Sequence, residues 1–450
     1  MPIRARSALR PSRSAVPRAA TALTAAALAV ATLAGCGGSG GDAGPAKDVD
    51  ADKLSGTVTV WSWDVAATAL TRLGQEFHAK YPNVTVEVVD VGYDNAQQKL
   101  SVGLKSGSGL PDLVTVESQQ MQSYLGKFPR GFVDLTDVAG PYKADMDPSK
   151  WTAAGDPDGR LAALPWDAGT AGLFYRTDYF GQAGVDPASI ETWDDLIAAG
   201  TKVKEATGAK LLVSDVSGSV SLVPLLMQQQ GAGYFSADGK ITLDSPAAAT
   251  SLDIVRRLDE AGLIHNETGW DALVRANKDG KVAAEPTGVW WSGTLTAEMP
   301  ELSGKFGVMP LPAVTPGGAR TASNGGSSLA IPAQAKNPDA AWAFAKFALA
   351  DPANQTSMMK NEGLFPAYLP ALKDPFFAEP QEYFGGQDIY TMFTEQTAKI
   401  PAITYTDDFA AAADLMKAVV SEVVLNGKDP AEELKGAADQ LASATGRERA

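Results

Sequence analysis

The sequence predicts an α/β protein in which mostly parallel sheets carry helices on their faces. Three observations lead to this prediction. Strand-like runs alternate with helical spacings, the links between them are short, and 45% of the 450 residues are hydrophobic. Because only 20% of the residues are charged, the chain can bury a substantial core, and disorder is excluded as a general description. The length suggests two or three domains, or one large body with two lobes.

The strands and helices near the start of the body are predicted in order. Residues 56–63 (GTVTVWSW) are β-branched and aromatic, which indicates a strand. A helix follows, because apolar residues recur at helical spacing over 66–77. Residues 83–91 (NVTVEVVDV) and 112–116 (DLVTV) predict two further strands, with a helix over 95–105 between them. A β-α-β-α-β order with short links implies parallel pairing.

Three later helices are marked by residues that favour helix starts. Thr192 precedes a run in which apolar residues recur at helical spacing. Ser245 and Asn337 each precede a proline that takes the first helical position. We expect each of these three residues to be an N-cap.

Composition and charge exclude several classes of function. The chain has 38 Lys and Arg against 53 Asp and Glu, a net charge of −15, which makes nucleic acid an improbable partner. With one Cys and two His, the chain has too few of these residues for a disulfide framework or a Cys/His zinc cage. The two histidines also offer few candidates for a Ser–His catalytic triad. We therefore expect neither a metal nor a cofactor.

The first 35 residues are predicted to be a signal peptide. Five arginines without an acid precede residues 19–34, which contain only Ala, Leu, Val and Thr and are too few to span a membrane. The segment ends in Leu33-Ala34-Gly35-Cys36, which resembles the bacterial lipobox, in which the cysteine is diacylated and becomes the new N-terminus. The alternative is an ordinary secretory signal with an incidental cysteine.

The mature chain is expected to be attached to the membrane by lipid. Without residues 1–35 it has 33 basic and 53 acidic residues, a net charge of −20. Residues 36–55 are rich in Gly, Ala and Asp and predict a flexible tether. No later segment has 18 consecutive apolar residues. We therefore expect the body at the extracellular face of the cell membrane, anchored by acyl chains on Cys36.

An ordered set of motifs resembles one protein family. The segments are GTVTVWSWD, EFHAKYPNVTVEVV, GSGLPDLVTVES and LAALPWDAGTAGLFYRTDYF, followed by TWDDL, DGKITLDSP, GVWWSG, FGVMPLP, NGGSSLAIP, KNPDAAWAFAKF and GLFPA. They are similar to the solute-binding proteins of ABC sugar importers with the maltose-binding-protein fold, in the branch of the lactose- and arabinose-type binders. The similarity extends from about residue 56 to about residue 428.

The resemblance implies a type II periplasmic-binding-protein-like fold with two lobes, a hinge, and a ligand between the lobes. Lobe 1 would contain residues 56–165 and 325–363, and lobe 2 would contain residues 166–324 and 364–450. It also implies a monomer that captures a mono- or oligosaccharide by closure of the lobes and delivers it to the transmembrane subunits of an ABC permease.

The chemistry of a sugar indicates which residues bind it. An indole matches the apolar C–H face, and a carboxylate or amide matches neighbouring hydroxyls. Trp63 and Asp64 follow the first predicted strand and Glu117 follows the third, at the carboxyl ends where open parallel sheets bind ligands. Trp61 points to the opposite face and is assigned to the core. A solvated loop acid is the alternative for Glu117.

Other candidate binding residues lie beside the expected crossings between lobes or on glycine-rich loops. They are Trp166, Asp167, Trp290, Trp291, Asn324, Gly326, Ser327, Phe384 and Gln387. One member of the Trp290–Trp291 pair is expected to line the cleft. Four further tryptophans are assigned to packing, namely Trp151, Trp193, Trp270 and Trp342.

Two other functions are alternatives to a binding protein. Glycoside hydrolysis needs only two carboxylates, and Glu117, Asp167 and Glu285 are candidates. Glu285 departs from the family pattern, because relatives more often carry a small or apolar residue there, and it places a charge near the expected cleft. A structural or adhesive lipoprotein is the other alternative. Because the Trp, Asp and Asn residues suit holding a sugar rather than cleaving it, we expect no enzymatic activity.

Overall fold

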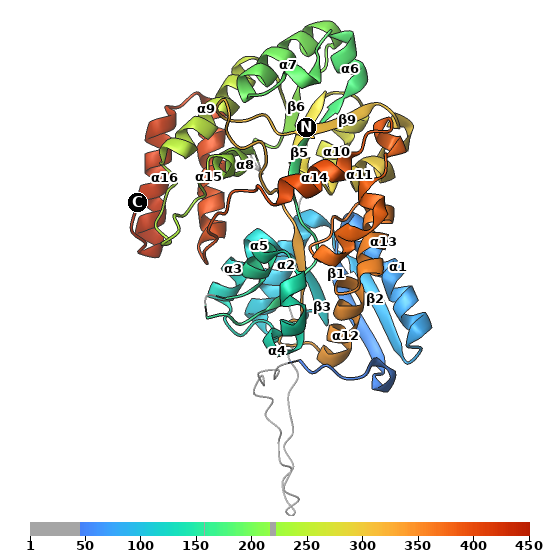
Figure 1. The fold of residues 1–450 in the computed structure, drawn as a ribbon. Coiled ribbons are helices and arrows are strands. Elements are labelled where there is room, and N and C mark those ends of the chain that lie inside the picture. The colour runs from blue at the N-terminus through green and yellow to red at the C-terminus, as the bar shows by residue number, and fades with distance from the viewer. Residues whose placement is uncertain (1–45, 157, 217–221) are drawn as a thin grey trace, which may run out of the picture. The chain divides into compact units, whose positions relative to one another are not determined.

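The computed structural model describes residues 46–156, 158–216 and 222–450. The predicted signal peptide, Cys36 and the first part of the predicted tether lie outside the described residues. In the described part, helices and strands alternate along the chain, which confirms the predicted α/β class (Figure 1). None of the described helices combines the length and the apolar character that crossing a membrane would require.

A five-stranded sheet forms the centre of the first lobe. Its strand order is β2-β1-β3-β10-β4. The strands are β1 (Gly56–Ser62), β2 (Val84–Asp90), β3 (Leu113–Glu117), β4 (Ala163–Pro165) and β10 (Ser327–Ala330). β1 pairs with β2 and β3 in parallel, as the β-α-β-α-β pattern predicts. β10 is antiparallel to β3 and β4, because the chain returns to this sheet from the second lobe in the opposite direction.

The second lobe contains a three-stranded and a two-stranded sheet. The larger has the order β8-β5-β9, formed by β5 (Ala171–Arg176), β8 (Ala284–Gly288) and β9 (Phe306–Pro310), and the smaller pairs β6 (Leu212–Ser214) with β7 (Ile264–Asn266). β6 and β7 are parallel, but β5 is antiparallel to both of its neighbours. This differs from the mostly parallel sheet expected for each lobe. The chain enters lobe 2 along β5 and leaves it along β9. These two neighbouring strands therefore run in opposite directions.

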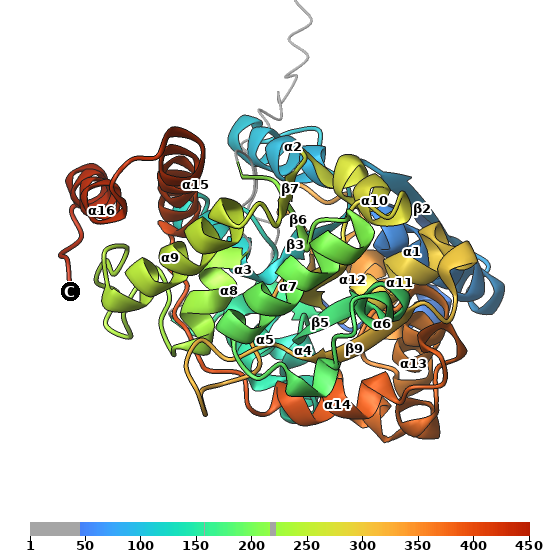
Figure 2. The same ribbon diagram turned by 90° about the horizontal axis from the view of Figure 1, so that it is seen from above.

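Helices cover the sheets of both lobes (Figure 1). Lobe 1 carries α1 (Asp64–Lys80), α2 (Tyr93–Ser106), α3 (Ser118–Lys127), α4 (Thr136–Ala139), α5 (Pro148–Ala154), α12 (Pro338–Leu349) and α13 (Pro352–Glu362). Lobe 2 carries α6 (Thr177–Gln182), α7 (Trp193–Thr207), α8 (Leu222–Gln229), α9 (Pro246–Glu260), α10 (Trp270–Lys278), α11 (Trp291–Glu298), α14 (Ile389–Thr397), α15 (Phe409–Asn426) and α16 (Pro430–Thr445). Helices α9, α15 and α16 pack side by side (Figure 2).

Short 3₁₀ helices occupy several of the connections. They cover Ala51–Lys53, Gly140–Asp145, Pro187–Ser189, Pro300–Leu302, Leu369–Lys373, Pro375–Ala378 and Glu382–Phe384. The last three lie between α13 and α14. This part of the chain contributes Phe377 and Phe384 to a cluster of buried residues that also contains Phe174 of β5.

Two of the three expected N-caps are confirmed and one is not. Thr192 forms a capping box with Asp195, and the hydroxyl of Ser245 accepts the N–H of Ala248. Asn337 precedes α12 but makes no side-chain cap. Its amide instead donates to the carbonyl of Thr57 at 2.7 Å, because α12 begins beside β1.

The end of the predicted tether packs against the body. Ala46 is buried, and its N–H donates to the carbonyl of Asp134 at 3.2 Å. The N–H of Lys47 donates to Asp339 at 3.1 Å, and Asp48 pairs with Lys346. The described residues before β1 therefore contact α12 instead of extending freely, because their apolar and acidic side chains find partners there.

Three segments of the chain meet between the two large sheets. Residues 166–170 connect β4 to β5, residues 311–326 connect β9 to β10, and residues 364–367 follow α13. We call these the crossing segments. Each large sheet has its own apolar core, one around β1 and β3 and the other around β5 and α7.

Candidate functional site

The crossing segments are hydrogen-bonded to one another. The N–H of Asn324 donates to the carbonyl of Gly169 at 2.7 Å, and the N–H of Ala168 donates to the carbonyl of Phe365 at 2.8 Å. A Cβ atom on Gly169 would lie 2.1 Å from the carbonyl oxygen of Asn324, so this close approach requires glycine. The candidate site is built beside this tightly packed backbone.

Four aromatic side chains form a row from lobe 1 to lobe 2. Trp63 precedes α1, and its ring centroid lies 5.7 Å from that of Tyr93, the first residue of α2. Tyr93 lies 6.3 Å from Trp270, the first residue of α10, and Trp270 lies 5.7 Å from Trp290. We call these four residues the aromatic row. Each of the four residues is at least partly exposed.

Asp64 lies beside the aromatic row in an unusual backbone conformation. Its φ of 51° is the one positive value among the non-glycine residues of the described ranges. Such strained residues cluster at functional sites. Its N–H donates to the carboxylate of Asp90 at 3.3 Å, and its own carboxylate accepts a hydrogen bond from Trp270 of lobe 2. Burial raises the pKa of Asp64 to about 6, and the charges of Glu298 and Asp90 act in the same direction.

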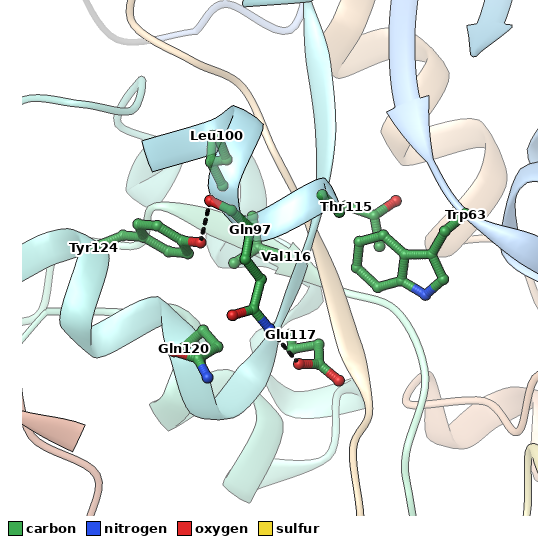
Figure 3. A pocket seen from close by; sticks show the side chains of 9 residues that line it. Trp63, Gln97, Leu100, Thr115, Val116, Glu117, Gln120 and Tyr124 are labelled. Carbon is green, nitrogen blue, oxygen red and sulfur yellow. Dashed lines mark hydrogen bonds between the residues drawn. The ribbon is translucent and has the colours of Figure 1, made fainter. Parts of the chain in front are cut away.

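Glu117 lies at the carboxyl end of β3 in a small pocket between α2 and α3 (Figure 3). Its carboxylate accepts the hydroxyl of Tyr93 at 3.2 Å and the side-chain amide of Gln97 at 3.1 Å. Figure 3 shows Gln97 directed at Glu117, with the indole of Trp63 across the pocket. Burial raises the pKa of Glu117 to about 7, and the hydrogen bond from Tyr93 opposes this shift. The pocket therefore presents an acceptor next to an aromatic face.

Asp167 and Lys150 are buried behind this site. Asp167 accepts the N–H of Ser327 at 2.7 Å, and the ammonium group of Lys150 donates to the carbonyl of Gly325 at 2.8 Å. Burial raises the pKa of Asp167 and lowers the pKa of Lys150, and the charge of each group opposes the shift of the other. A Cβ atom on Gly326 would lie 2.5 Å from the ammonium nitrogen. Lys150 therefore holds α5 to the crossing segments, and the predicted binding residues Asp167, Gly326 and Ser327 lie at this contact.

Trp290 and Asn324 connect the aromatic row to the crossing segments. The indole N–H of Trp290 donates to the carbonyl of Asn324 at 2.8 Å. The side-chain amide of Asn324 donates to the hydroxyl of Thr287 at 3.1 Å. Because the indole nitrogen is occupied, Trp290 offers a ligand its ring rather than its N–H group.

Four other predicted binding residues are used by the fold itself. Trp166 is 1% exposed, Trp291 is fully buried and Phe384 is 4% exposed, and each belongs to an apolar core. The amide of Gln387 bonds to both backbone groups of Val308. In the sequence, an aromatic residue beside a glycine-rich loop looks the same whether it packs inward or faces a ligand.

Glu285 faces α10 and not the aromatic row. Its carboxyl contacts Asn277, and one of its oxygens has no hydrogen-bond partner among the described residues. Burial raises the pKa of Glu285 to about 8. The family pattern led us to expect the charge of Glu285 near the cleft. In the structure Glu285 is instead a buried carboxyl between β8 and α10.

Sequence reasoning missed Tyr93, Gln97 and Trp270. Trp270 was assigned to packing, and it does pack against the apolar cluster that contains Trp291, but it is also the member of the aromatic row that meets lobe 1. Tyr93 and Gln97 belong to the helix that follows β2, and applying the strand-end argument to β2 would have found Tyr93. The assignment of Trp193 and Trp342 to packing is confirmed, since both are fully buried.

The arrangement suits binding of a flat, hydroxylated ligand. Rings of the aromatic row can cover an apolar face, while Asp64 and Glu117 can accept hydrogen bonds from hydroxyls. In the described part of the chain, no group of three or more His, Cys, Asp or Glu side chains is arranged to hold a metal ion.

The sequence matches the model of one protein family. Residues 62–355 match the family described as bacterial extracellular solute-binding protein. The lactose-binding protein of Rhizobium radiobacter is 30% identical over 402 residues, which covers 86% of this chain and 93% of that protein. The arabinooligosaccharide-binding protein of Bacillus subtilis (strain 168) is 27% identical over 413 residues, covering 87% and 94%.

Solved structures share the fold. The ABC transporter associated binding protein from B. animalis subsp. lactis Bl-04, in complex with beta-1,6-galactobiose, is similar with a TM-score of 0.78 at 24% identity, covering 87% of this chain and 98% of that one. The maltose-bound MalE3 of T. maritima has a TM-score of 0.74 at 21% identity, covering 86% and 99%. These similarities confirm the predicted type II periplasmic-binding-protein-like fold with two lobes.

Proposed function

The chain belongs to the bacterial extracellular solute-binding protein family, and on this basis we propose that it captures a carbohydrate between its lobes and delivers it to an ABC permease. The relatives named for lactose and arabinooligosaccharides support a carbohydrate ligand. In this proposal the protein acts as a monomer, and contacts between the sugar and both lobes favour the closed state.

The aromatic row is the observation that carries this proposal. Trp63 and Tyr93 belong to lobe 1, whereas Trp270 and Trp290 belong to lobe 2. A sugar that stacks on rings from both lobes gains contacts only when the lobes are together. Glu117 and Asp64 supply acceptors at the lobe 1 end of the row.

We propose a binding protein rather than a glycosidase. Glycoside hydrolysis needs two carboxylates on opposite sides of the bond to be cleaved. Of the three acids considered from the sequence, Asp167 is bound to the N–H of Ser327, and Glu285 is buried against α10. Of these three, only Glu117 lies in the pocket next to the aromatic row, and Asp64, the other acid beside the row, does not line that pocket. Prolonged incubation should return oligosaccharides intact, whereas release of shorter sugars would contradict this proposal.

We also propose that acyl chains on Cys36 hold the mature protein at the outer surface of the cell membrane. The support is the lipobox-like sequence around the single cysteine of the chain. The family description places these proteins outside the cell, which agrees with a secreted form.

A ligand screen tests the proposed function. Tryptophan fluorescence would be recorded with lactose, beta-1,6-galactobiose and arabinooligosaccharides, and with glycerol 3-phosphate as an anionic control. We expect a saturable change with at least one of the sugars, because three of the four residues of the aromatic row are tryptophans. Small-angle X-ray scattering on the same samples should show a smaller radius of gyration with that sugar. A protein that responds to none of the sugars, or to the phosphate alone, would contradict a carbohydrate ligand.

A further inference from the structure

The crossing segment before β10 ends in three successive carbonyl groups that contact three different parts of the molecule. The carbonyl of Asn324 accepts the indole N–H of Trp290 at 2.8 Å. The carbonyl of Gly325 accepts a hydrogen bond from the ammonium group of Lys150 at 2.8 Å. The carbonyl of Gly326 accepts the N–H of the first residue of α3 at 2.9 Å. We call these three consecutive residues the carbonyl segment.

The carbonyl segment joins the two ends of the candidate site. At one end it binds Trp290, which belongs to the aromatic row in lobe 2. At the other end it binds Ser118, which directly follows Glu117 in lobe 1. Ser327, the next residue after the segment, is the register partner of Glu117 in the pairing of β10 with β3. A movement of the carbonyl segment therefore changes the positions of both Trp290 and Glu117.

Two glycines leave the carbonyl segment without rigidity of its own. Gly325 and Gly326 have φ values of 80° and 89°, and glycine enters and leaves this region at little cost. The conformation must therefore be fixed by contacts with other residues. The charged contact comes from Lys150, whose ammonium group also donates to the hydroxyl of Ser323 at 3.4 Å.

Lys150 acts on the site from behind. It belongs to α5, is 7% exposed and does not line the pocket of Glu117. Its backbone N–H donates to Asp147, the N-cap of α5, at 3.1 Å, so its own helix fixes the base of the side chain. Without the ammonium group, the carbonyl of Gly325 would lose its charged donor, and the two glycines would be free to turn.

We propose that Lys150 is a positioning residue for sugar binding, because its ammonium group holds the carbonyl segment that carries Trp290 on one side and the Glu117 end of β3 on the other. This inference rests on the proposed function. It adds a residue that touches no sugar but determines where the aromatic face and the carboxylate acceptor lie.

The charge of Lys150 also acts on Glu117. Burial raises the pKa of Glu117, the charge of Asp167 raises it further, and the charge of Lys150 lowers it. Loss of the ammonium group should therefore move the ionisation of Glu117 to higher pH. A lysine that only stabilised the fold would not change this ionisation, so the pH dependence of sugar affinity distinguishes the two roles.

Four further titratable groups lie near these charges. Asp147 is the third acid that acts on the ammonium group, and it accepts two N–H groups at the start of α5. The hydroxyl of Tyr93 donates to Glu117. Tyr124 and Tyr405 also lie near Glu117, and burial raises the pKa of each to about 12. These two tyrosines therefore stay neutral between pH 6 and pH 9.

The test removes the ammonium group and measures affinity against pH. Lys150→Met keeps the length of the side chain without its charge. Lys150→Gln keeps a neutral donor that is one atom shorter. Lys143→Met is the matched control, because Lys143 is exposed on the 3₁₀ helix that precedes α5. Isothermal titration calorimetry with lactose, beta-1,6-galactobiose and arabinooligosaccharides at pH 6, 7, 8 and 9 gives the affinity of each protein.

Lys150→Met should bind sugar about threefold to tenfold more weakly than the wild type at pH 7. The pH at which affinity is half-maximal should rise by about 0.5–1 unit. At pH 9, where Glu117 is largely ionised in every protein, Lys150→Met should remain weaker because the carbonyl segment is displaced. Lys150→Gln should show the same rise in pH with a smaller loss at pH 9, and Lys143→Met should match the wild type.

Three outcomes would overturn the inference. They are wild-type affinity and pH dependence in Lys150→Met, a loss of affinity with unchanged pH dependence, and a shifted pH dependence with wild-type affinity at pH 9. If Lys150→Met does not fold, the pH dependence of Lys150→Gln decides alone. In each case the wild type still binds sugar, so the proposed function stands. If the wild type binds none of the sugars, the proposed function fails and the role of Lys150 fails with it.

Discussion

Ligand affinity should fall as the pH falls through the pKa of Glu117. Burial holds this pKa at about 7 in the unliganded protein. A sugar hydroxyl that donates to the carboxylate stabilises its ionised form, so the pKa of Glu117 must be lower in the complex. Protons therefore compete with the sugar, and binding releases a proton near neutral pH.

The size of this effect follows from the pKa. A group with a pKa of about 7 is ionised in roughly one molecule in eleven at pH 6 and in roughly ten in eleven at pH 8. If the pKa in the complex is about 5 or lower, affinity should be about tenfold weaker at pH 6 than at pH 8, which is about 1.4 kcal/mol. Asp64, with a pKa of about 6, adds about a factor of two over the same range.

Isothermal titration calorimetry at pH 6, 7 and 8 would measure this dependence. Repeating the titration at pH 7 in two buffers with different ionisation enthalpies gives the number of protons released. Glu117→Gln keeps the shape of the side chain but cannot ionise, so its affinity should vary only about twofold across this range. The reasoning is refuted if wild-type affinity is constant with pH, if it rises at low pH, or if Glu117→Gln shows the full tenfold dependence.

Three further predictions concern other parts of the chain. Cys36→Ala should release the protein from membranes into the medium with unchanged sugar affinity, which fractionation and titration would check, and a membrane-bound variant would contradict the anchor. Trp290→Ala should weaken binding by about 1–3 kcal/mol, roughly 5–150-fold, because an aromatic face is lost, and unchanged affinity in a variant with wild-type circular dichroism would remove Trp290 from the site. Glu285 keeps its proton up to about pH 8 in the folded protein but only to about pH 4.5 when unfolded, so stability that is fully present below about pH 4.5 should be lost progressively as the pH rises to about 8. Denaturant titration of the wild type should show a loss of roughly 1–3 kcal/mol between pH 6 and pH 9, and the same loss in Glu285→Gln would show that another group is responsible.

Local patterns in the sequence determined the secondary structure and the class of function. β-branched runs predicted β1, β2 and β3, and their alternation with helices predicted the parallel pairing that the structure shows. Thr192 and Ser245 marked their helices correctly. These features depend on neighbours within a few residues, so they can be recognised from the sequence without knowledge of the fold. Trp63, Asp64 and Glu117 were placed at the carboxyl ends of strands for the same reason, and the structure has them there.

Only the tertiary structure decided which aromatic residues lie together in the candidate site. Trp270 meets Tyr93, and Asp64 accepts a hydrogen bond from Trp270, although these residues are far apart in the sequence. Trp166 and Trp291 occur in motifs as suggestive as that of Trp290, yet both are buried. Exposure, pKa and contact between lobes depend on how distant segments pack together. A local pattern carries no information about that packing, which is why the sequence could propose Trp290 but not the contacts of Trp270 with Trp290 and with Tyr93 of lobe 1.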